Sequence, residues 1–412
     1  MYELSFRSRI KAVVLAGGKG ERLQPLTTHT PKPLIRIVGK ALVDYVLEGL
    51  TTLPLEEVIV IVSDRKVGNH IVGKWSSKLL LTVAYQRKPG IEGAMLAARE
   101  YLGKGESFVL AYGDIVVDKE AYLRTYETYL SKGSDGVIML SPKIDVESYG
   151  IAYVSEERIS KVEEKPIPQR AKSTLAVAGI FILPYAIFEY LETDMSFTES
   201  LNTLASTRTL TYYMWSKWWV DIGYPWDILE ANKNILSELK GSYISDKAHV
   251  SSKAIVEGKV YIDDGAEVDH NAIIKGPVYI GKNSFVGAGA FVRKFASIEE
   301  EVIVGAYSEV KNSSIQPNVT ISSFSFIGDS IVGSNTTIGP RTITLNIIPS
   351  GVKVSRLHPL KVKDKVVSKL GAIIGCNCYI GASSVLYAGS VVESNTRLKP
   401  FSIVETNLSK YA

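Results

Sequence analysis

The feature that most constrains the fold of this chain is a six-residue repeat of aliphatic side chains in its second half. The repeat slips by one residue after Val310, resumes at Ile315 and returns between Ile374 and Leu398. Its uninterrupted series comprises Ile244, Val250, Val256, Ile262, Val268, Ile274, Ile280, Val286, Val292, Ile298, Val304 and Val310. A period of six predicts a parallel β-helix, in which each hexad forms one side of a triangular coil. The aliphatic side chains then stack into one continuous core.

The first half of the chain has a different pattern, in which apolar segments alternate with amphipathic ones. We expect helices near residues 42–50, 94–102 and 120–130, and strands at 58–62, 79–85, 108–112 and 136–140. This alternation predicts an α/β fold with a Rossmann-like, mostly parallel sheet and ligands at the carboxyl ends of its strands. At 412 residues the chain is too long for one ordinary core. We therefore expect two domains, residues 1–237 and residues 238–412.

The composition indicates a globular protein with neither a nucleic-acid nor a membrane partner. Hydrophobic residues make up 46% of the chain, charged residues 22%, and the formal net charge is only +4. No stripe of Lys and Arg with interleaved aromatics occurs, and no apolar run reaches membrane-spanning length. Residues 1–9 lack the apolar core of a signal peptide, and Cys376 and Cys378 are too few for a disulfide framework. We expect a cytoplasmic protein with reduced, structural thiols.

A glycine-rich loop follows the first apolar strand, with the sequence Leu15-Ala-Gly-Gly-Lys-Gly-Glu-Arg22. Its glycines let the backbone approach a ligand and direct N–H groups at phosphate, and Arg22 and Lys32 supply cations suited to a triphosphate. A Walker A loop would end in Gly-Lys-Ser/Thr, and the dinucleotide motif would carry a third glycine where Leu23 stands. The loop therefore belongs to neither of these two classes.

The segment from Leu15 to Leu34 resembles the signature of the sugar-1-phosphate nucleotidylyltransferases, in particular the glucose-1-phosphate thymidylyl- and uridylyltransferases. The resemblance implies an enzyme that joins UTP or dTTP to a hexose-1-phosphate, either glucose or an N-acetylhexosamine, and releases pyrophosphate with the help of Mg²⁺. It implies that Arg22 and Lys32 are catalytic cations. It also implies nucleotide contacts from Leu15, Ala16, Gly17, Gly18, Gly20 and Glu21.

Two carboxylates match the metal ligands of that family. Asp114 ends an apolar strand with the family's Gly-Asp pair, although an Asp in this place is often a helix N-cap. Asp221 lies in Trp218-Trp-Val-Asp-Ile-Gly223, where the tryptophans are expected to be core. A carboxylate among aromatic side chains needs a cationic partner. We interpret both aspartates as Mg²⁺ ligands.

Further resemblances assign the sugar phosphate and the base. Gly150, Glu164, Lys165 and Gly179 are similar to the family's sugar-phosphate contacts, and Lys165 is also assigned a catalytic role, gripping the phosphate. Val177 stands where the family commonly has Asn, which leaves the identity of the sugar open. Gln86 follows a strand, and its amide can both donate to and accept from a pyrimidine. Gly93 would let the base lie flat, although Ala94 replaces the family's Thr and a surface Gln remains the alternative for Gln86.

The hexads resemble the left-handed β-helix domains of hexapeptide-repeat proteins, and the two halves together resemble enzymes that make nucleotide sugars. Some of those enzymes are bifunctional and also acetylate an amino-sugar phosphate on the β-helix with a catalytic His. Here Ser323 replaces that His and Phe326 replaces a Tyr, whereas Asn346 and residues 369–375 still match. Serine without a base cannot replace imidazole. We therefore expect the β-helix to serve trimerisation or regulator binding without acetyl transfer.

Two questions stay open at this stage. Relatives with the same two-domain build include non-catalytic regulatory scaffolds, but a scaffold has no reason to keep the charged groups Arg22, Lys32, Asp114, Lys165 and Asp221. Residues 345–370 interrupt the hexads with a Pro- and Lys-containing segment, which is either functional or a solvated excursion.

Overall fold

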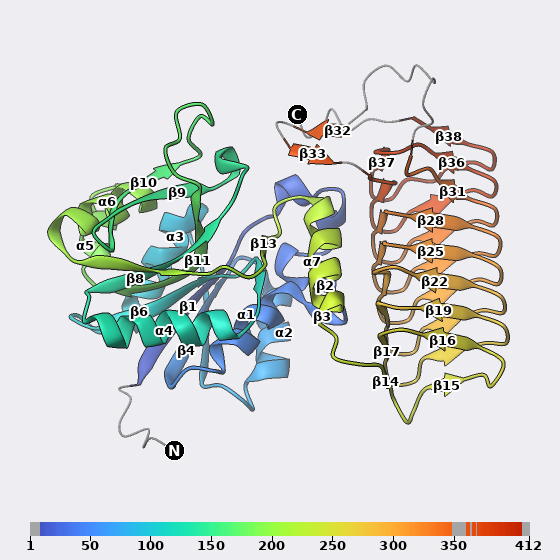
Figure 1. Ribbon diagram of the computed structural model, residues 1–412, viewed down its shortest axis with the longest axis horizontal. Helices are drawn as coiled ribbons and strands as arrows, with labels where there is room; N and C mark the ends of the chain where they lie inside the picture. Colours follow the sequence, from blue (N-terminus) through green and yellow to red (C-terminus); the bar gives the residue numbers. More distant parts are fainter. Residues whose placement is uncertain (1–8, 348–359, 363–364, 368, 406–412) are drawn as a thin grey trace. The chain divides into compact units, whose positions relative to one another are not determined.

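The structure is a computed structural model that describes residues 9–347, 360–362, 365–367 and 369–405 (Figure 1). The expectation about residues 1–9 therefore falls almost entirely outside the described residues. The chain divides into two compact units, of which the first comprises residues up to Lys19 together with Leu42–Asp221. The second comprises Gly20–Ala41 and everything from Ile222 onward. The segment that carries Arg22 and Lys32 thus groups with the C-terminal half.

A nine-stranded sheet forms the centre of the first unit, in the order β5-β4-β1-β6-β11-β8-β12-β10-β9. Pairing is parallel from β5 to β6 and between β8 and β12, and antiparallel at the other neighbours, so the sheet is mixed. The expected α/β sheet and the expected strands are confirmed, but the sheet is not mostly parallel, because four of its eight neighbouring pairs are antiparallel. The strands are β1 (Ile10–Ala16), β4 (Leu55–Val62), β5 (Leu81–Tyr85), β6 (Ser107–Tyr112), β8 (Gly136–Pro142), β9 (Gly150–Ser155), β10 (Arg158–Glu164), β11 (Leu175–Pro184) and β12 (Leu210–Met214).

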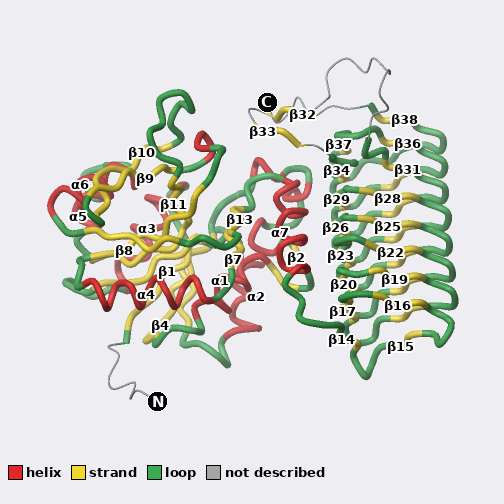
Figure 2. Tube along the Cα trace, viewed as in Figure 1, coloured by secondary structure: helices red, strands yellow, loops and turns green. Residues whose placement is uncertain are grey.

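Helices flank this sheet (Figure 2). Helix α1 packs on α4, and α5 packs on both α3 and α6. Local signals set their ends: Ser196 and Glu199 form a capping box at the start of α6, and Gly133 ends α4 in the left-handed conformation at φ 57°. The helices are α1 (Leu42–Leu50), α2 (Arg65–Trp75), α3 (Gly90–Ala98), α4 (Glu120–Lys132), α5 (Ile187–Leu191) and α6 (Phe197–Thr207).

A short antiparallel ribbon of β7 (Ile115–Val117) and β13 (Trp219–Asp221) completes the first unit. The second unit begins with the segment Gly20–Ala41, which contains three short 3₁₀ turns and the hairpin of β2 (Arg36–Ile37) and β3 (Lys40–Ala41). Helix α7 (Pro225–Ser237) follows in this unit. The expected domain boundary at residue 237 coincides with the end of α7.

The rest of the second unit is a three-sided parallel β-helix, seen as the stack of coils in Figure 1. Its first sheet contains β14 (Tyr243–Ile244), β17 (Val260–Ile262), β20 (Val278–Ile280), β23 (Ser297–Ile298), β26 (Ser314–Ile315), β29 (Ile331–Val332), β34 (Ile373–Ile374) and β37 (Val391–Val392). Its second contains β15 (His249–Val250), β18 (Glu267–Val268), β21 (Phe285–Val286), β24 (Ile303–Val304), β27 (Thr320–Ile321), β30 (Thr337–Ile338) and β35 (Tyr379–Ile380). Its third contains β16 (Ile255–Glu257), β19 (Ile273–Lys275), β22 (Phe291–Arg293), β25 (Glu309–Lys311), β28 (Phe326–Gly328), β31 (Ile343–Thr344), β36 (Val385–Leu386) and β38 (Ile403–Val404).

From Ile262 to Val392 the hexad side chains form the core of this coil, as predicted, whereas Ile244 is exposed and Val250 and Val256 are only partly buried. Ile280, Ile298, Ile315 and Val332 are successive register partners, and each of them is fully buried. The one-residue slip after Val310 does not break the stack, because Ile298 and Ile315 remain partners across a coil shortened by one residue. Cys376 and Cys378 are buried and free of disulfides.

The interruption at 345–370 contains an antiparallel pair, β32 (Leu360–Val362) and β33 (Lys365–Val367). Residues 348–359, 363–364 and 368 of this segment lie outside the described residues. The expectation that the segment is either functional or a solvated excursion therefore lies largely outside them too. Among the helices that the structure describes, none combines the length and apolar character needed to cross a membrane.

Candidate active site

The glycine-rich loop leaves β1 next to the side chain expected to contact the base. A Cβ added to Gly17 would lie 2.2 Å from Oε1 of Gln86, so the Gln86 amide rests against the Gly17 backbone. Gln86 follows β5, and its N–H donates to the carbonyl of Val62 at 3.0 Å. A cavity of about 840 Å³ lies beside Gln86 and Gly93. The parallel half of the sheet therefore brings two expected nucleotide contacts, Gly17 and Gln86, to one place.

Gly93 lies in the first turn of α3, where a Cβ would stand only 2.1 Å from the carbonyl oxygen of Lys88. Only glycine fits so close to a backbone carbonyl. Lys88 also lines the cavity, together with Tyr85 and Arg87. The glycine thus allows a tight turn at the edge of the cavity, consistent with its expected place near the nucleotide.

The β7–β13 ribbon brings the two expected metal ligands together. Asp114 immediately precedes β7, and Asp221, the last residue of β13, is the register partner of Ile115. The two aspartates therefore occupy neighbouring positions at one end of the ribbon. Trp219 of the same strand is buried. The ammonium group of Lys143 donates to the Trp219 carbonyl at 3.0 Å and lies 4.8 Å from the centre of the Trp219 indole. These contacts anchor the strand that carries Asp221.

Tyr112, which we did not single out in the sequence, ends β6, and its ring lies against Gly179. Burial raises the pKa of the Tyr112 hydroxyl well above its usual range, and the negative charges of Glu164, Asp114 and Asp221 raise it further. The charge of Glu92 raises this pKa as well, so four carboxylates affect one phenol, and only Asp114 is close to it in the sequence. The available signal was the position of Tyr112 at the end of β6, two residues before Asp114.

The expected sugar-phosphate residues lie on three strands of the same sheet. Gly150 of β9 is the register partner of Glu164 of β10, and a Cβ on Gly150 would lie 3.1 Å from Oε2 of Glu164. The Lys165 ammonium is 3.6 Å from Oε1 of Glu164, and both side chains are more than half exposed. Gly179 adopts φ 79° where β11 shifts register, with its Cβ position 3.0 Å from the Tyr112 ring. The structure therefore brings Gly150, Glu164 and Lys165 together and sets Gly179 against Tyr112.

Leu15 and Ala16 end β1, and Gly18 follows them in the first compact unit, whereas Gly20, Glu21, Arg22 and Lys32 belong to the second. Gly20 adopts φ 69°, and a Cβ there would lie 2.9 Å from Cβ of Lys32. Thr27 donates to the Gly20 carbonyl at 2.7 Å, so the loop folds back on itself. Lys32 is only 7% exposed, whereas Glu21 is exposed. The close approach to Lys32 and the left-handed backbone both require glycine at position 20.

Arg22 is exposed and lies over an aromatic ring at the start of α7. Its guanidinium carbon is 5.1 Å from the centre of the Tyr224 ring. The buried Asp227 accepts hydrogen bonds from the N–H groups of Gly223 at 3.0 Å and Tyr224 at 2.6 Å, which fixes this turn. The turn after Asp221 therefore orients the cation expected to meet a triphosphate.

The donor set of Asp114 and Asp221 fits Mg²⁺. This ion is commonly held by one or two carboxylates and completes its coordination with water and substrate phosphate. Among the residues described, no group of three or more His, Cys, Asp or Glu side chains is arranged to hold a metal ion. A pair of neighbouring carboxylates therefore suits an ion shared with a nucleotide better than a fully protein-bound one.

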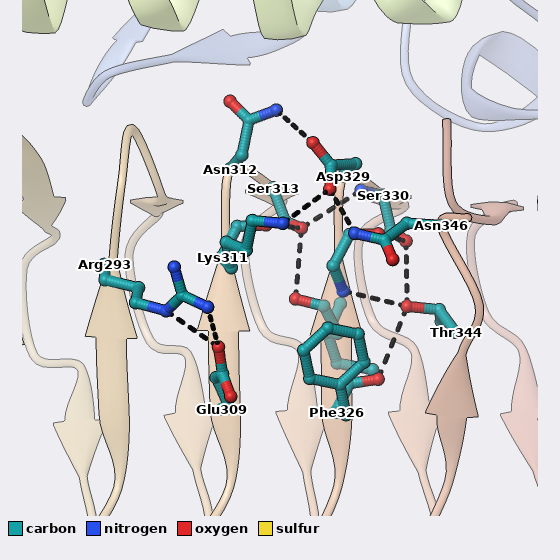
Figure 3. A network of polar contacts seen from close by, with 12 residues as sticks. Arg293, Glu309, Lys311, Asn312, Ser313, Phe326, Asp329, Ser330, Thr344 and Asn346 are labelled. Carbon is teal, nitrogen blue, oxygen red and sulfur yellow. Dashed lines mark hydrogen bonds and ion pairs between the residues drawn. The ribbon is translucent and has the colours of Figure 1, made fainter. Parts of the chain in front are cut away.

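A polar network occupies the third face of the β-helix, around the segment where Ser323 replaces the expected His (Figure 3). The buried Asp329 accepts hydrogen bonds from Asn312 at 2.6 Å, from Lys311 at 3.3 Å and from Asn346. Phe326 begins β28 in this network, and its carbonyl accepts from Thr344 at 3.3 Å. An organised polar network thus surrounds Asp329, six residues after Ser323 in the sequence.

Comparisons with known proteins find matches along nearly the whole chain. The sequence matches the family model described as nucleotidyl transferase over residues 11–238 and that of the GMPPB C-terminal domain over residues 274–368. It is 33% identical to the bifunctional protein GlmU of Methanocaldococcus jannaschii, across 93% of this chain and 96% of that protein. It is 30% identical to the bifunctional sugar-1-phosphate nucleotidylyltransferase/acetyltransferase of Sulfurisphaera tokodaii, across 97% and 98%. A candidate glucose-1-phosphate thymidylyltransferase from Bacillus anthracis, solved with sucrose, is similar with a TM-score of 0.50 at 25% identity, covering 57% of this chain and 98% of that one.

Proposed function

Because this chain belongs to the nucleotidyl transferase family, we propose that it joins UTP or dTTP to a hexose-1-phosphate and releases pyrophosphate. It is a sugar-1-phosphate nucleotidyltransferase, and the finer choice of base and sugar is the proposal. The observation that carries it is the neighbouring position of Asp114 and Asp221 at one end of the β7–β13 ribbon, in the same compact unit as the Gln86–Gly17 contact. A nucleotide and a sugar phosphate both find partners in that unit.

The reaction needs no covalent intermediate with the protein. An oxygen of the sugar-1-phosphate attacks the α-phosphorus of the triphosphate, the bond to the β-phosphate breaks, and pyrophosphate leaves. The protein contributes positioning and charge stabilisation. Gln86 recognises the imide edge of a pyrimidine, Glu164 accepts from sugar hydroxyls, and Lys165 holds the sugar phosphate. Arg22 and Lys32 neutralise the charge that builds up on the departing pyrophosphate.

Asp114 and Asp221 would hold Mg²⁺. When bound, the ion polarises phosphate oxygens and offsets their charge. The carboxylates also repel a phosphate that arrives without a metal, so they select for the metal complex of the nucleotide. This assignment rests on their neighbouring positions on the β7–β13 ribbon.

A pyrophosphate-release screen tests the proposed function. UTP, dTTP, ATP, GTP and CTP are each combined with glucose-1-phosphate, N-acetylglucosamine-1-phosphate, galactose-1-phosphate and mannose-1-phosphate, with Mg²⁺ present. We expect turnover with UTP or dTTP and with a gluco-configured sugar. No release with any pair would favour the regulatory-scaffold alternative. Preference for a purine nucleotide would overturn the role given to Gln86.

Acetyl transfer on the β-helix is the second candidate, favoured by the two bifunctional relatives that align along nearly the whole chain. The replacement of the catalytic imidazole by Ser323 argues against it, because a serine hydroxyl near neutral pH is a poor base. Incubation with acetyl-CoA and glucosamine-1-phosphate or galactosamine-1-phosphate distinguishes a bifunctional enzyme from one that transfers only the nucleotide. We expect little CoA release from the native chain, and robust release would establish the bifunctional reading.

We propose in addition that the chain forms a homo-oligomer, favouring a trimer, through its β-helix, and that it acts in the cytoplasm, where nucleoside triphosphates are made. The proposed domain boundary stays at residue 237, the end of α7, which is close to the end of the family match at residue 238. Light scattering after gel filtration tests the assembly. A species of three times the chain mass is expected.

A further inference from the structure

The hairpin that follows the phosphate loop is bonded to a buried glutamine of the β-helix. Gln316 is 2% exposed, and its Oε1 accepts from the N–H of Arg36 at 3.0 Å. Its Nε2 donates to the carbonyl of Arg36 at 2.9 Å and to the Ser314 hydroxyl at 3.0 Å. One side-chain amide thus satisfies both backbone groups of Arg36, as a neighbouring strand would. Arg36 belongs to β2, within the same compact unit as the β-helix.

A buried acid on the preceding coil makes the next contact. Glu299 is fully buried, and its Oε2 accepts from the N–H of Gly39 at 2.9 Å, while its Oε1 accepts from Ser297 at 2.6 Å. Gly39 adopts φ 79°, and a Cβ there would lie 2.3 Å from the hydroxyl oxygen of Tyr279, so only glycine fits. An ion pair between Arg36 and Glu300, 2.7 Å long, lies beside this contact.

The β-helix itself does not require these two side chains. Glu299 and Gln316 follow the register partners Ile298 and Ile315, so they occupy the same corner of successive coils. On other coils that corner is Gly281, Gly333 or Gly375, or else the short Ser245, the partly exposed Asp263 or the exposed Glu393, so the coil does not require a long buried polar side chain there. Burying a carboxyl or an amide costs free energy unless its polar atoms are bonded. Because the hairpin supplies those bonds, the two long side chains serve the hairpin rather than the coil.

The β-helix also holds the earlier part of the segment. Ser394 donates to the carbonyl of Pro25 at 2.8 Å, and Asn395 contacts His29 at 3.0 Å. The segment Gly20–Ala41 is therefore attached before and after Lys32. Since Gly20 packs directly on Lys32, a shift of either attachment would move the proposed triphosphate cations.

We propose that Glu299 and Gln316 are positioning residues for nucleotidyl transfer, which hold the hairpin and thereby keep Lys32 and Arg22 in the arrangement that binds the triphosphate. This inference rests on the proposed function, because it concerns the same reaction. It makes the β-helix a structural requirement of the first step, independent of any acetyl transfer.

Four variants test the proposal: Glu299→Gln, Glu299→Leu, Gln316→Leu and, as a matched control, Asp264→Asn. Asp264 is an acid of the β-helix bonded to Ser245 and Lys247, with no contact to the hairpin in the described structure. We expect Glu299→Leu and Gln316→Leu each to raise KM for the nucleotide about tenfold, the effect of losing a buried hydrogen-bond partner. The KM for the sugar phosphate should stay within about twofold. Glu299→Gln should restore most of the affinity, because its amide oxygen can still accept from Gly39.

A pH profile supplies a readout that a purely structural role would not move. Burial raises the pKa of Glu299 to about 7, and the negative charge of Glu300 also raises it. Hydrogen bonds from Ser297 and Gly39 and the positive charge of Arg36 lower this pKa. Tyr279 and its acceptor Asp263 are the other titratable groups facing this corner. Proton binding therefore favours the docked hairpin. The KM of the native enzyme for the nucleotide should rise as the pH passes from about 6 to about 8, and Glu299→Gln should lack this rise.

Hydrogen exchange at the Arg36 and Gly39 amides separates this inference from the proposed function. Faster exchange in Glu299→Leu and Gln316→Leu, without faster exchange in Asp264→Asn, supports the positioning role. If the native chain releases no pyrophosphate with any substrate pair, the proposed function fails, while exchange still reports on the hairpin. Native KM values in both leucine variants, or an equal rise in the Asp264→Asn control, would overturn the inference. If a leucine variant does not fold, the pH profile of Glu299→Gln decides.

Discussion

Asp114 and Asp221 occupy neighbouring positions at one end of the β7–β13 ribbon, because Asp221 is the register partner of Ile115. Two carboxylates that are far apart in the chain thereby form one oxygen donor set. The buried Trp219 and its contact with Lys143 hold the strand in place. The relationship gives the metal assignment a geometric basis.

Replacing either aspartate should abolish transfer without unfolding the chain. We expect Asp114→Asn and Asp221→Asn each to lower kcat at least about 100-fold, because charge stabilisation of the leaving group is lost. Pyrophosphate release measures the rate, and circular dichroism checks the fold. Glu56→Gln, which changes an exposed carboxylate at the start of β4, serves as the control. Removal of Mg²⁺ with EDTA should reproduce the loss in the native chain, and full turnover in both Asn variants would refute the assignment.

Adding one methyl group at Gly17 should impair nucleotide binding more than stability. Its Cβ would lie 2.2 Å from Oε1 of Gln86, the mobile end of a side chain, so Gln86 can move aside at little cost to folding. We expect Gly17→Ala to raise KM for the nucleotide about tenfold or more, since the base loses its amide partner. Gly73→Ala in α2, where a Cβ meets nothing within 4 Å, should leave KM unchanged. Equal KM values for the nucleotide in both variants would show that Gln86 does not recognise the base.

The buried Asp44 should be a main contributor to stability in the first unit. It accepts from His70 at 2.9 Å, Lys74 at 2.7 Å and Trp75 at 2.7 Å, which ties α2 to α1. Burial raises the pKa of Asp44, but these hydrogen bonds outweigh burial and hold its pKa well below the ordinary value of 3.8. Asp44→Asn should lower the free energy of unfolding by about 2–3 kcal/mol.

The same carboxyl predicts sensitivity to acid. Because the folded pKa of Asp44 lies below its unfolded value, its contribution is present above about pH 4 and is lost as the pH falls further. Urea unfolding of the native chain and of Asp44→Asn, compared at neutral pH and near pH 3, measures the difference. The gap between the two proteins should narrow in acid. A gap that is independent of pH would contradict the ionised state of Asp44.

Glu299 predicts the opposite pH dependence. Its folded pKa is raised from 4.5 to about 7, mainly by burial, so the folded chain binds a proton that the unfolded chain has released. Its contribution to stability is therefore fully present below about pH 4.5 and declines as the pH rises to 7, by about 1.4 kcal/mol for each pKa unit of the shift. Thermal unfolding at pH 5 and pH 8 should show native stability falling relative to Glu299→Gln. Asp264→Asn should show no such trend in this range.

How much of the protein could be predicted from its sequence differs between the two halves. The hexad series predicted most coils of the β-helix, because one repeated side chain makes the same contact on each turn, but it missed the coil of β29, β30 and β31. In the first unit, apolar periodicity predicted β1, β4, β5, β6 and β8, whereas β9, β10, β11 and β12 were not predicted. Tyr112 was read only as the end of a strand. The shift of its pKa depends on carboxylates of β10 and β13 and on Asp114, which precedes β7.

Glu299 and Gln316 carried no signal at all. A polar residue at the corner of a coil is ordinarily solvent-exposed, and only the fold shows these two buried beneath Arg36 and Gly39. The sequence also did not predict that Gly20–Ala41 belongs to the same compact unit as the β-helix, because this segment lies far from the hexads in the chain.

The sequence by itself determined the two architectures, the phosphate loop and the class of reaction. These features depend on repeats and on contiguous motifs, which can be recognised from residues that are close together in the chain. The family resemblance had already assigned Asp114 with Asp221 to a metal and Gln86 with Gly17 to a nucleotide, but only the tertiary structure showed the register and contacts that join each pair, and it alone joined Gln316 to Arg36. Those pairings arise from strand register and coil stacking, which are set by the packing of the whole chain and leave no trace in the spacing of the residues along it.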